Sequence, residues 1–282
     1  MNKRCDLHTH STFSDGTLSP TQLIAHAQQV GLSAVALTDH NTVAGLPEFL
    51  SAAQGYSVEA VPGIEFSTDY EDTELHIVAL FIQPAHYPAI TELTEEMNKR
   101  KMQSNLDLIQ NLNRAGYDIS YEAIKSAMPA GEPNRALIAA ELMKKGYCSS
   151  VKEAFQTLLG TDCGYYHPPK RIDSYSLISM IRSLGAVSVL AHPYLHIKSD
   201  ARLESFLETA VEMGLDGMET RYPLFSPEQT TALEQLCHRF GLAQSGGSDF
   251  HGENKPDIQL GTGKGQLEVP FSFLQELRMR IR

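Results

Sequence analysis

The 282-residue sequence predicts an α/β protein in which parallel strands alternate with helices, either as a β/α barrel or as a doubly wound sheet. Two observations predict this class. Short apolar runs recur along the chain, and most of them are separated by segments with helical or capped patterns. Nearly every run leads into a His, Asp or Glu, and barrels of this class carry their chemistry at the carboxyl ends of the strands.

The first strand and the first helix both have clear local signals. His8 and His10 are two residues apart on a short strand, so their side chains project to the same side and can bind one metal ion together. Segment 18–31 begins with Ser19 as a candidate N-cap and Pro20 at the first helical position, and it closes on a glycine. Those signals predict a helix.

The next apolar run, residues 34–37, is typical of a buried strand and delivers His40. Five further apolar runs follow. Residues 58–64 are followed by Glu65, 187–191 by His192, 215–218 by Glu219, and 242–248 by Asp249 and His251, whereas the run 75–81 contains His76 near its start. With the opening strand, that makes seven. Only His76 lies early in its run, and the others predict one polar site at the strand ends.

The strand signal disappears between about residues 88 and 170, where helical periodicity replaces it. The expected helices cover 89–114, 121–128, 135–145 and 151–159. We therefore predict a barrel in two parts, 1–87 and 171–282, interrupted by a helical insertion domain over 88–170. Because the insertion interrupts the barrel at a βα loop, we expect it to lie over the mouth of the site as a lid and specificity element.

Composition narrows the class of partner. The formal net charge of -11 argues against an extended basic groove for long nucleic acid, but a small anionic substrate is compatible with it. The chain starts without a signal peptide and has no run of eighteen apolar residues, so we expect a cytoplasmic protein without a membrane partner. The four cysteines are scattered, which predicts reduced and mostly buried thiols.

The polar residues at the strand ends form a candidate metal cluster. Imidazole and carboxylate without thiolate suit zinc, manganese or iron(II), and nine donors fit three ions better than one or two. Asp249 and His251 repeat the two-residue spacing of the opening histidines, whereas Asp15 alone would be an ordinary turn residue. The candidate ligands are His8, His10, Asp15, His40, Glu65, His76, His192, Asp249 and His251.

Seven motifs together resemble those of the polymerase and histidinol phosphatase (PHP) superfamily, and they span the chain except for the insertion. They are Asp6-Leu7-His8-Thr9-His10-Ser11, Ser14-Asp15-Gly16, Leu37-Thr38-Asp39-His40-Asn41, Pro62-Gly63-Ile64-Glu65, Leu75-His76-Ile77, Leu190-Ala191-His192-Pro193 and Gly246-Gly247-Ser248-Asp249-Phe250-His251-Gly252. Gly131-Glu132-Pro133-Asn134-Arg135 in the insertion is similar to the TrpH-type branch, which contains the nucleoside 3′,5′-bisphosphate phosphatase and the short-RNA exonuclease RNase AM.

This resemblance implies a distorted seven-stranded barrel with a trinuclear site of manganese, iron or zinc. It assigns His8, His10, Glu65 and Asp249 to the first ion, Asp15, His40 and His251 to the second, and Glu65, His76 and His192 to the third. A metal-bridged hydroxide would attack phosphorus, so no protein nucleophile is needed. Asp6 and Asp39 lie next to ligands, where they would either orient imidazoles or cap loops.

A substrate with a second phosphate needs a further anion site. Arg135 is the best candidate, because an arginine in the first turn of a helix is opposed by the macrodipole and an anion shared with the helix N-terminus removes that conflict. Asn134 precedes it in the branch motif, and Lys170 and Arg221 are weaker candidates. The branch tends to place a histidine two positions after this arginine, where this chain has Leu137.

The predicted function is hydrolysis of a small nucleotide phosphoester: the 3′-phosphate of a nucleoside 3′,5′-bisphosphate, or short RNA trimmed from its 5′ end. A phosphatase of a non-nucleotide monoester such as histidinol phosphate is the alternative. Amidohydrolases also begin with His-x-His, but they usually bridge their metals with a carboxylated lysine, a role that falls to Glu65 here. A binding module that has lost catalysis would be expected to lose ligands, and all nine are present.

Overall fold

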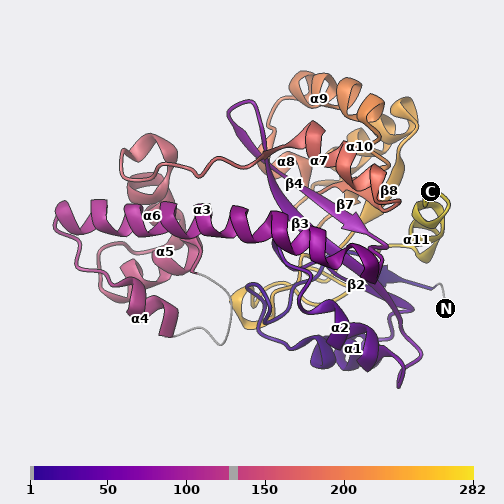
Figure 1. The fold of residues 1–282 in the computed structure, drawn as a ribbon, viewed down its shortest axis with the longest axis horizontal. Helices are drawn as coiled ribbons and strands as arrows, with labels where there is room; N and C mark the ends of the chain where they lie inside the picture. The colour runs from indigo at the N-terminus through magenta and orange to yellow at the C-terminus, as the bar shows by residue number, and fades with distance from the viewer. Residues whose placement is uncertain (1–2, 127–132) are drawn as a thin grey trace. The chain divides into compact units, whose positions relative to one another are not determined.

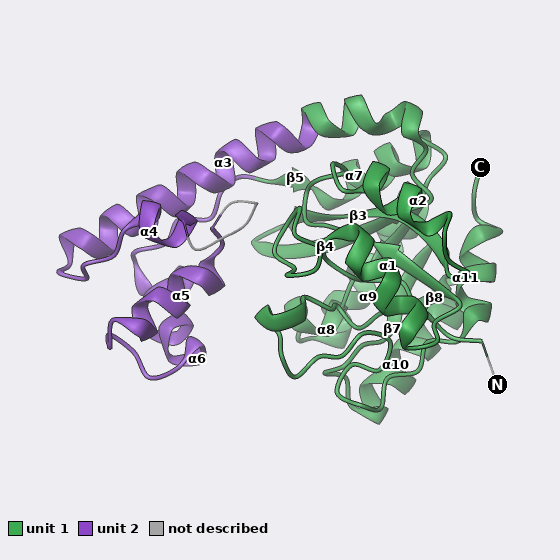
Figure 2. Ribbon diagram, turned by 90° about the horizontal axis from the view of Figure 1, so that it is seen from below, with its two compact units in different colours: residues 1–92, 171–282 green, residues 93–170 purple. Residues whose placement is uncertain are grey.

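The computed structural model describes residues 3–126 and 133–282, which divide into two compact units (Figure 2). Unit 1 joins residues 1–92 to residues 171–282, and unit 2 covers residues 93–170. The division falls inside α3 (Tyr87–Arg114), the helix predicted over 89–114.

Unit 1 is built on a nearly closed seven-stranded barrel with strand order β1-β2-β3-β4-β6-β7-β8. Figure 1 labels five of these strands, β2, β3, β4, β7 and β8. The strands are β1 (Cys5–Asp6), β2 (Ala34–Leu37), β3 (Glu59–Tyr70), β4 (Thr73–Leu80), β6 (Val187–Leu190), β7 (Gly217–Arg221) and β8 (Ala243–Gly246). The first and last strands meet where the Leu7 amide donates to the Gly246 carbonyl at 3.1 Å. The predicted α/β barrel is confirmed.

One strand runs against the others. β4 pairs antiparallel with both β3 and β6, so the interpretation of uniformly parallel strands was wrong at this position. The start of β4 therefore lies at the same edge as the carboxyl ends of its neighbours: His76 is opposite Ser67, and the Ala191 amide donates to the His76 carbonyl at 3.0 Å. This reversal explains why His76, alone among the candidates, lies early in its run.

Helices cover the outside of the barrel. They are α1 (Pro20–Gln29), α2 (Leu46–Ala53), α7 (Ser174–Ser183), α8 (Pro193–His196), α9 (Asp200–Met213), α10 (Pro227–Phe240) and α11 (Phe271–Arg278), with 3₁₀ turns η1 (Pro84–His86) and η4 (Gly252–Asn254). Ser19 is the N-cap of α1 and Pro20 begins the helix, as the sequence predicted; Gln22 completes a reciprocal capping box with Ser19. Helix α2 was not predicted; it begins at Gly45 without a side-chain cap and so lacks the usual start signal. The two-residue strand β5 (Ile172–Asp173), which pairs with β3, was also missed.

Unit 2 has its own helices and its own core. They are α4 (Tyr121–Ser126), α5 (Arg135–Lys144), α6 (Val151–Ala154), the π-helical turn η2 (Phe155–Leu159) and the 3₁₀ turn η3 (Thr161–Cys163). Leu112, Ile138, Leu142 and Leu159 are fully buried in this core. The last two residues of the helix expected over 121–128, and Gly131-Glu132 of the insertion motif, lie outside the described residues.

The core of unit 1 consists of small and branched apolar side chains from the strands, including Ala36, Val61, Val78 and Val189, with α11 packed against them. The four cysteines are free thiols, three of them buried and Cys163 half-buried, as predicted. Among the described helices, none combines the length and the apolar character that a membrane-spanning segment needs.

Candidate metal centre

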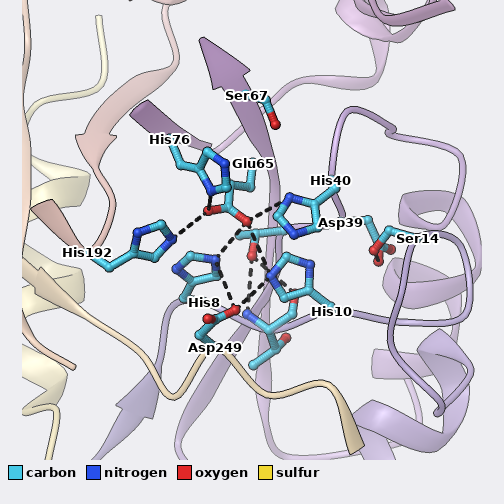
Figure 3. Close-up of polar contacts among 12 residues, drawn as sticks. His8, His10, Ser14, Asp39, His40, Glu65, Ser67, His76, His192 and Asp249 are labelled. Carbon is cyan, nitrogen blue, oxygen red and sulfur yellow. Dashed lines mark hydrogen bonds and ion pairs between the residues drawn. The ribbon is translucent and has the colours of Figure 1, made fainter. Parts of the chain in front are cut away.

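The carboxylate of Glu65, on β3, lies at the centre of the candidate site and is fully buried (Figure 3). Its Oε2 lies 3.1 Å from Nε2 of His8 and 3.0 Å from Nδ1 of His40. Its Oε1 lies 2.8 Å from Nδ1 of His76 and 3.0 Å from Nε2 of His192. A fifth imidazole, of His10, lies 3.3 Å from Oε2 through Nε2. Five histidines from four strand ends thus surround one carboxylate.

A second carboxylate, from the loop after the opening strand, lies beside this group. Oδ1 of Asp15 is 3.1 Å from Nε2 of His251, and Oδ2 is 3.9 Å from Nε2 of His40. The rings of His10 and His251 stack with centroids 4.1 Å apart. Asp15, a predicted ligand whose local motif taken alone is that of a turn, therefore lies among the clustered donors.

The two oxygens of Asp249 face different partners. Oδ1 lies 3.2 Å from Nε2 of His10, inside the cluster. Oδ2 accepts hydrogen bonds from the Tyr222 hydroxyl at 2.8 Å and from the Lys255 ammonium at 2.7 Å. These two donors hold the carboxylate so that a single oxygen is presented to the histidines. Neither residue was predicted, because they lie on loops and no spacing rule connects them with Asp249.

Glu219, in the middle of β7, orients two of the histidines. Its Oε1 is 2.8 Å from Nδ1 of His8, and its Oε2 accepts the backbone N–H of His192 at 2.6 Å. A carboxylate on Nδ1 fixes the tautomer in which Nε2 is free to coordinate, an arrangement found at most protein metal sites. The sequence placed Glu219 at a strand end but did not assign it to the site.

Asp6 and Asp39 do not contact the imidazoles directly; they fix the loops that carry the ligands. Asp6 accepts the backbone N–H groups of Ser248 at 2.9 Å and Gly261 at 2.8 Å. Asp39 accepts the backbone N–H of Ser11 at 2.7 Å, and burial raises the pKa of its carboxyl to about 6. Of the two roles considered for these residues, loop capping is the one that the contacts support.

The backbone approaches the site closely at one glycine. A Cβ on Gly247 would lie 2.4 Å from Cβ and 2.5 Å from the amide nitrogen of His8, so only glycine fits at this position. His192 and Asp249 adopt positive φ angles of 27° and 54°, which L-residues rarely adopt. Both angles place candidate donors on sharp turns just beyond their strands.

Burial and neighbouring charges together shift the pKa values of the cluster, some downward and some upward. Burial, with the charge of His251, lowers the pKa of His10 to about 4. Burial also acts to lower the pKa of His76, but the charge and hydrogen bond of Glu65 outweigh it and raise that pKa to about 9. Burial would raise the pKa of Glu65; the neighbouring charged histidines, led by His8, instead hold it well below its usual range.

The donor set fits divalent metal ions. Several buried polar atoms of the cluster lack a hydrogen-bond partner among the described residues, including Nε2 of His8 and His10, Nδ1 of His40 and Oε2 of Glu65. Leaving such atoms unsatisfied costs about 1–3 kcal/mol each, so their convergence on one space indicates a bound cation. Within each of the following groups the donor atoms lie within 4.8 Å of one another: His10, Asp15, His40 and His251; His8, His10 and Asp249; His8, Glu65 and His192; His40, Glu65 and His76; and His76, His192 and His196. The last group includes His196, which the sequence analysis did not consider.

Two of the predicted substrate contacts, Asn134 and Arg135, begin α5 in unit 2. The Asn134 side chain caps the helix by accepting the Leu137 N–H at 3.0 Å. The Arg135 guanidinium lies 4.2 Å from the ring centroid of Tyr166. Lys170, at the end of the same unit, is exposed. The roles of all three in substrate binding stay predictions.

Arg221, on β7, is engaged outside the cluster. Its guanidinium lies 2.5 Å from a carboxylate oxygen of Glu234 on α10 and 5.9 Å from the ring centroid of Phe273 on α11. The next residue, Tyr222, is the one that reaches Asp249. The role of Arg221 in substrate binding stays a prediction.

Comparison with known proteins agrees with this geometry. A model of the PHP domain matches residues 6–173. The chain belongs to the PHP domain family. A 5′-3′ exoribonuclease of Haemophilus influenzae is 33% identical over 251 residues, which cover 89% of this chain and 91% of that protein. A 3′,5′-nucleoside bisphosphate phosphatase of Chromobacterium violaceum is 27% identical over 277 residues, covering 98% of this PHP chain and 97% of the relative.

The fold of this PHP protein is shared with solved structures. A crystal structure of a candidate metal-dependent phosphoesterase from Bifidobacterium adolescentis superposes with a TM-score of 0.84 at 27% identity, covering 99% of this chain and 97% of the other. Together with the family match and the relatives, this similarity identifies the chain as a metal-dependent phosphoesterase of the PHP type, and hence as a hydrolase.

Proposed function

We propose that this PHP phosphoesterase acts on small nucleotides, removing the 3′-phosphate of nucleoside 3′,5′-bisphosphates or trimming short 5′-phosphorylated RNA from its 5′ end. The observation that carries the proposal is the Glu65 carboxylate among five imidazoles, joined by the carboxylates of Asp15 and Asp249. The relatives named for exoribonuclease and bisphosphate phosphatase activities support the nucleotide class. The net charge of -11 favours a short substrate over long nucleic acid.

Three divalent ions, of manganese, iron or zinc, would be held by the nine donors. The first would bind to His8, His10, Glu65 and Asp249, the second to Asp15, His40 and His251, and the third to Glu65, His76 and His192. Donor atoms of His8, His10 and Asp249 lie within 4.8 Å of one another, as do those of Asp15, His40 and His251 together with His10, which supports the first two ions. Glu65 lies equally close to His8 with His192 and to His40 with His76, which supports its place between the ions. Bound divalent ions lower the pKa of water and offset charge on phosphoryl oxygens, which removes the need for a protein nucleophile.

The chain's own contribution is to fix the donors before substrate arrives. Glu219 accepts from Nδ1 of His8 and so directs Nε2 into the cluster. Tyr222 and Lys255 hold one oxygen of Asp249 and leave the other facing His10. Because the metal ligands are already in place, they need no rearrangement when charge develops on the phosphoryl group. Such preorganised electrostatic stabilisation is the usual source of rate enhancement in phosphoryl transfer.

A substrate panel tests the proposal. Protein loaded with manganese, iron or zinc would be given nucleoside 3′,5′-bisphosphate, nucleoside 5′-monophosphate, short 5′-phosphorylated RNA and histidinol phosphate, with phosphate release and product identity measured. We expect the highest kcat/KM on the bisphosphate or the short RNA. A preference for histidinol phosphate would overturn the nucleotide assignment, and no turnover of any phosphoester with any of the three metals would overturn the enzyme assignment itself.

A further inference from the structure

His196 ends α8, one helical turn after His192. Residues four apart on a helix share a face, so the two imidazoles are neighbours. Their ring centroids are 5.2 Å apart, and the His196 ring lies 4.9 Å from that of His76 on β4. The motif that identifies His192 ends at Pro193 and does not include His196.

The distances suit a shared metal ion. One nitrogen from each of His76, His192 and His196 lies within 4.8 Å of the other two. Imidazole nitrogens bind zinc at about 2.0–2.1 Å, so two of them on one ion lie at most about 4.2 Å apart. Small side-chain rotations therefore bring all three nitrogens into coordination range. Among the residues that the structure describes, no hydrogen bond holds the His196 ring in another position.

We propose that His196 is an additional ligand of the third ion, beside His76, His192 and Glu65; this rests on the proposed function in that the cluster must hold metal. Glu65 already contacts two of these histidines, at 2.8 Å from His76 and 3.0 Å from His192. Three imidazoles and one carboxylate make four protein ligands, the usual number of a closed zinc site. Such a nitrogen-rich set favours zinc, iron or cobalt over magnesium and calcium.

A fourth protein ligand should make the third metal ion harder to remove. A site with four protein donors leaves a tetrahedral ion no position for water, whereas the sites that activate water keep one open. In the assignment above the first ion also has four protein donors, whereas the third has only three without His196. Loss of His196 should therefore make the third ion easier to remove.

Metal retention tests the proposal without relying on activity. The intact protein, loaded with zinc, would be dialysed against increasing concentrations of a chelator, and zinc per chain measured by inductively coupled plasma mass spectrometry. We expect one ion of His196→Gln to be lost at a chelator concentration at least tenfold lower than the corresponding ion of wild type. His238→Gln, which changes an exposed histidine on α10, should retain zinc like wild type.

A crystal structure of the zinc-loaded wild-type protein provides a second measurement that does not depend on a variant folding. Anomalous scattering should place an ion about 2.0–2.2 Å from a nitrogen of His196. Ions on the other donors with His196 more than about 3 Å from each, or equal retention by His196→Gln and wild type, would overturn this proposal alone. Failure of the wild-type protein to bind any ion would overturn the proposed function as well.

Discussion

Replacing Glu219 by Gln tests how the chain prepares its histidines. In the wild-type protein both oxygens of this carboxylate accept a donor, one from the ring of His8 at 2.8 Å and one from the backbone of His192 at 2.6 Å. Gln has the same size but only one acceptor oxygen. In either orientation of the amide, its NH₂ group faces a hydrogen-bond donor, which is the ring N–H of His8 or the backbone N–H of His192.

The size of the effect follows from that loss. A hydrogen bond to a charged group contributes about 1.5–3 kcal/mol, and removing a partner that supports a metal ligand typically costs 10–100-fold in metal affinity or activity. Since each tenfold corresponds to about 1.4 kcal/mol, the two estimates agree. We therefore expect Glu219→Gln to bind its weakest ion 10–100-fold less tightly than wild type.

Competition with a chromogenic chelator would measure the affinity, and phosphate release at saturating metal would measure kcat/KM. Glu212→Gln is the matched control, because Glu212 is exposed on α9 and should leave both values unchanged. If Glu219→Gln bound all ions and turned over within twofold of wild type, the orienting role of Glu219 would be refuted.

Three further outcomes follow from the site. Tyr222→Phe removes the hydroxyl that donates to Oδ2 of Asp249 and should weaken metal binding about tenfold. Circular dichroism should show an intact fold, and an unchanged metal affinity would exclude a role of Tyr222 in positioning Asp249. Gly247→Ala places a Cβ against the backbone of His8 and should lower the free energy of unfolding by about 1–3 kcal/mol in urea denaturation, an effect that a variant as stable as wild type would contradict. The pKa of His76 rises from 6.5 to about 9 on folding, so the proton it retains stabilises the metal-free protein fully below pH 6.5 and this contribution is lost as the pH rises through 9. The unfolding temperatures of the metal-free wild type and of metal-free His76→Gln should therefore differ less at pH 9.5 than at pH 6. An equal difference at the two pH values would contradict the raised pKa of His76.

The sequence predicted the barrel because hydrophobic runs and their polar ends are local signals, read one strand at a time. The capping box of α1 and the positions of most strands follow from such signals. The direction of β4 is different, because pairing is decided by neighbours far along the chain and leaves no trace in an eight-residue run. The early position of His76 was the one visible sign of that reversal.

Residues that contact the candidate metal ligands, rather than the metal itself, were harder to predict from the sequence. Glu219 follows an apolar run, as most of the candidate ligands do, and could have been included on that ground. Tyr222 and Lys255 meet Asp249 only through the fold, from the end of β7 and from a loop after β8. His196 lies on α8, four residues after His192, a spacing that the sequence analysis did not use; its other neighbour, His76, lies on β4, so no spacing within one segment connects those two. Arg221 was selected for its place near a strand end, which does not reveal its ion pair with Glu234; its role in substrate binding stays a prediction.

The central claim is that the cluster around Glu65 binds metal ions and thereby hydrolyses a phosphoester. The most direct measurement is phosphate release from a nucleoside 3′,5′-bisphosphate as a function of ions bound per chain, for wild type and Glu65→Gln. We expect no release from metal-free wild type, an increase as ions bind, and loss of both metal binding and release in Glu65→Gln. Release from the metal-free protein, or an undiminished rate in Glu65→Gln, would contradict the claim.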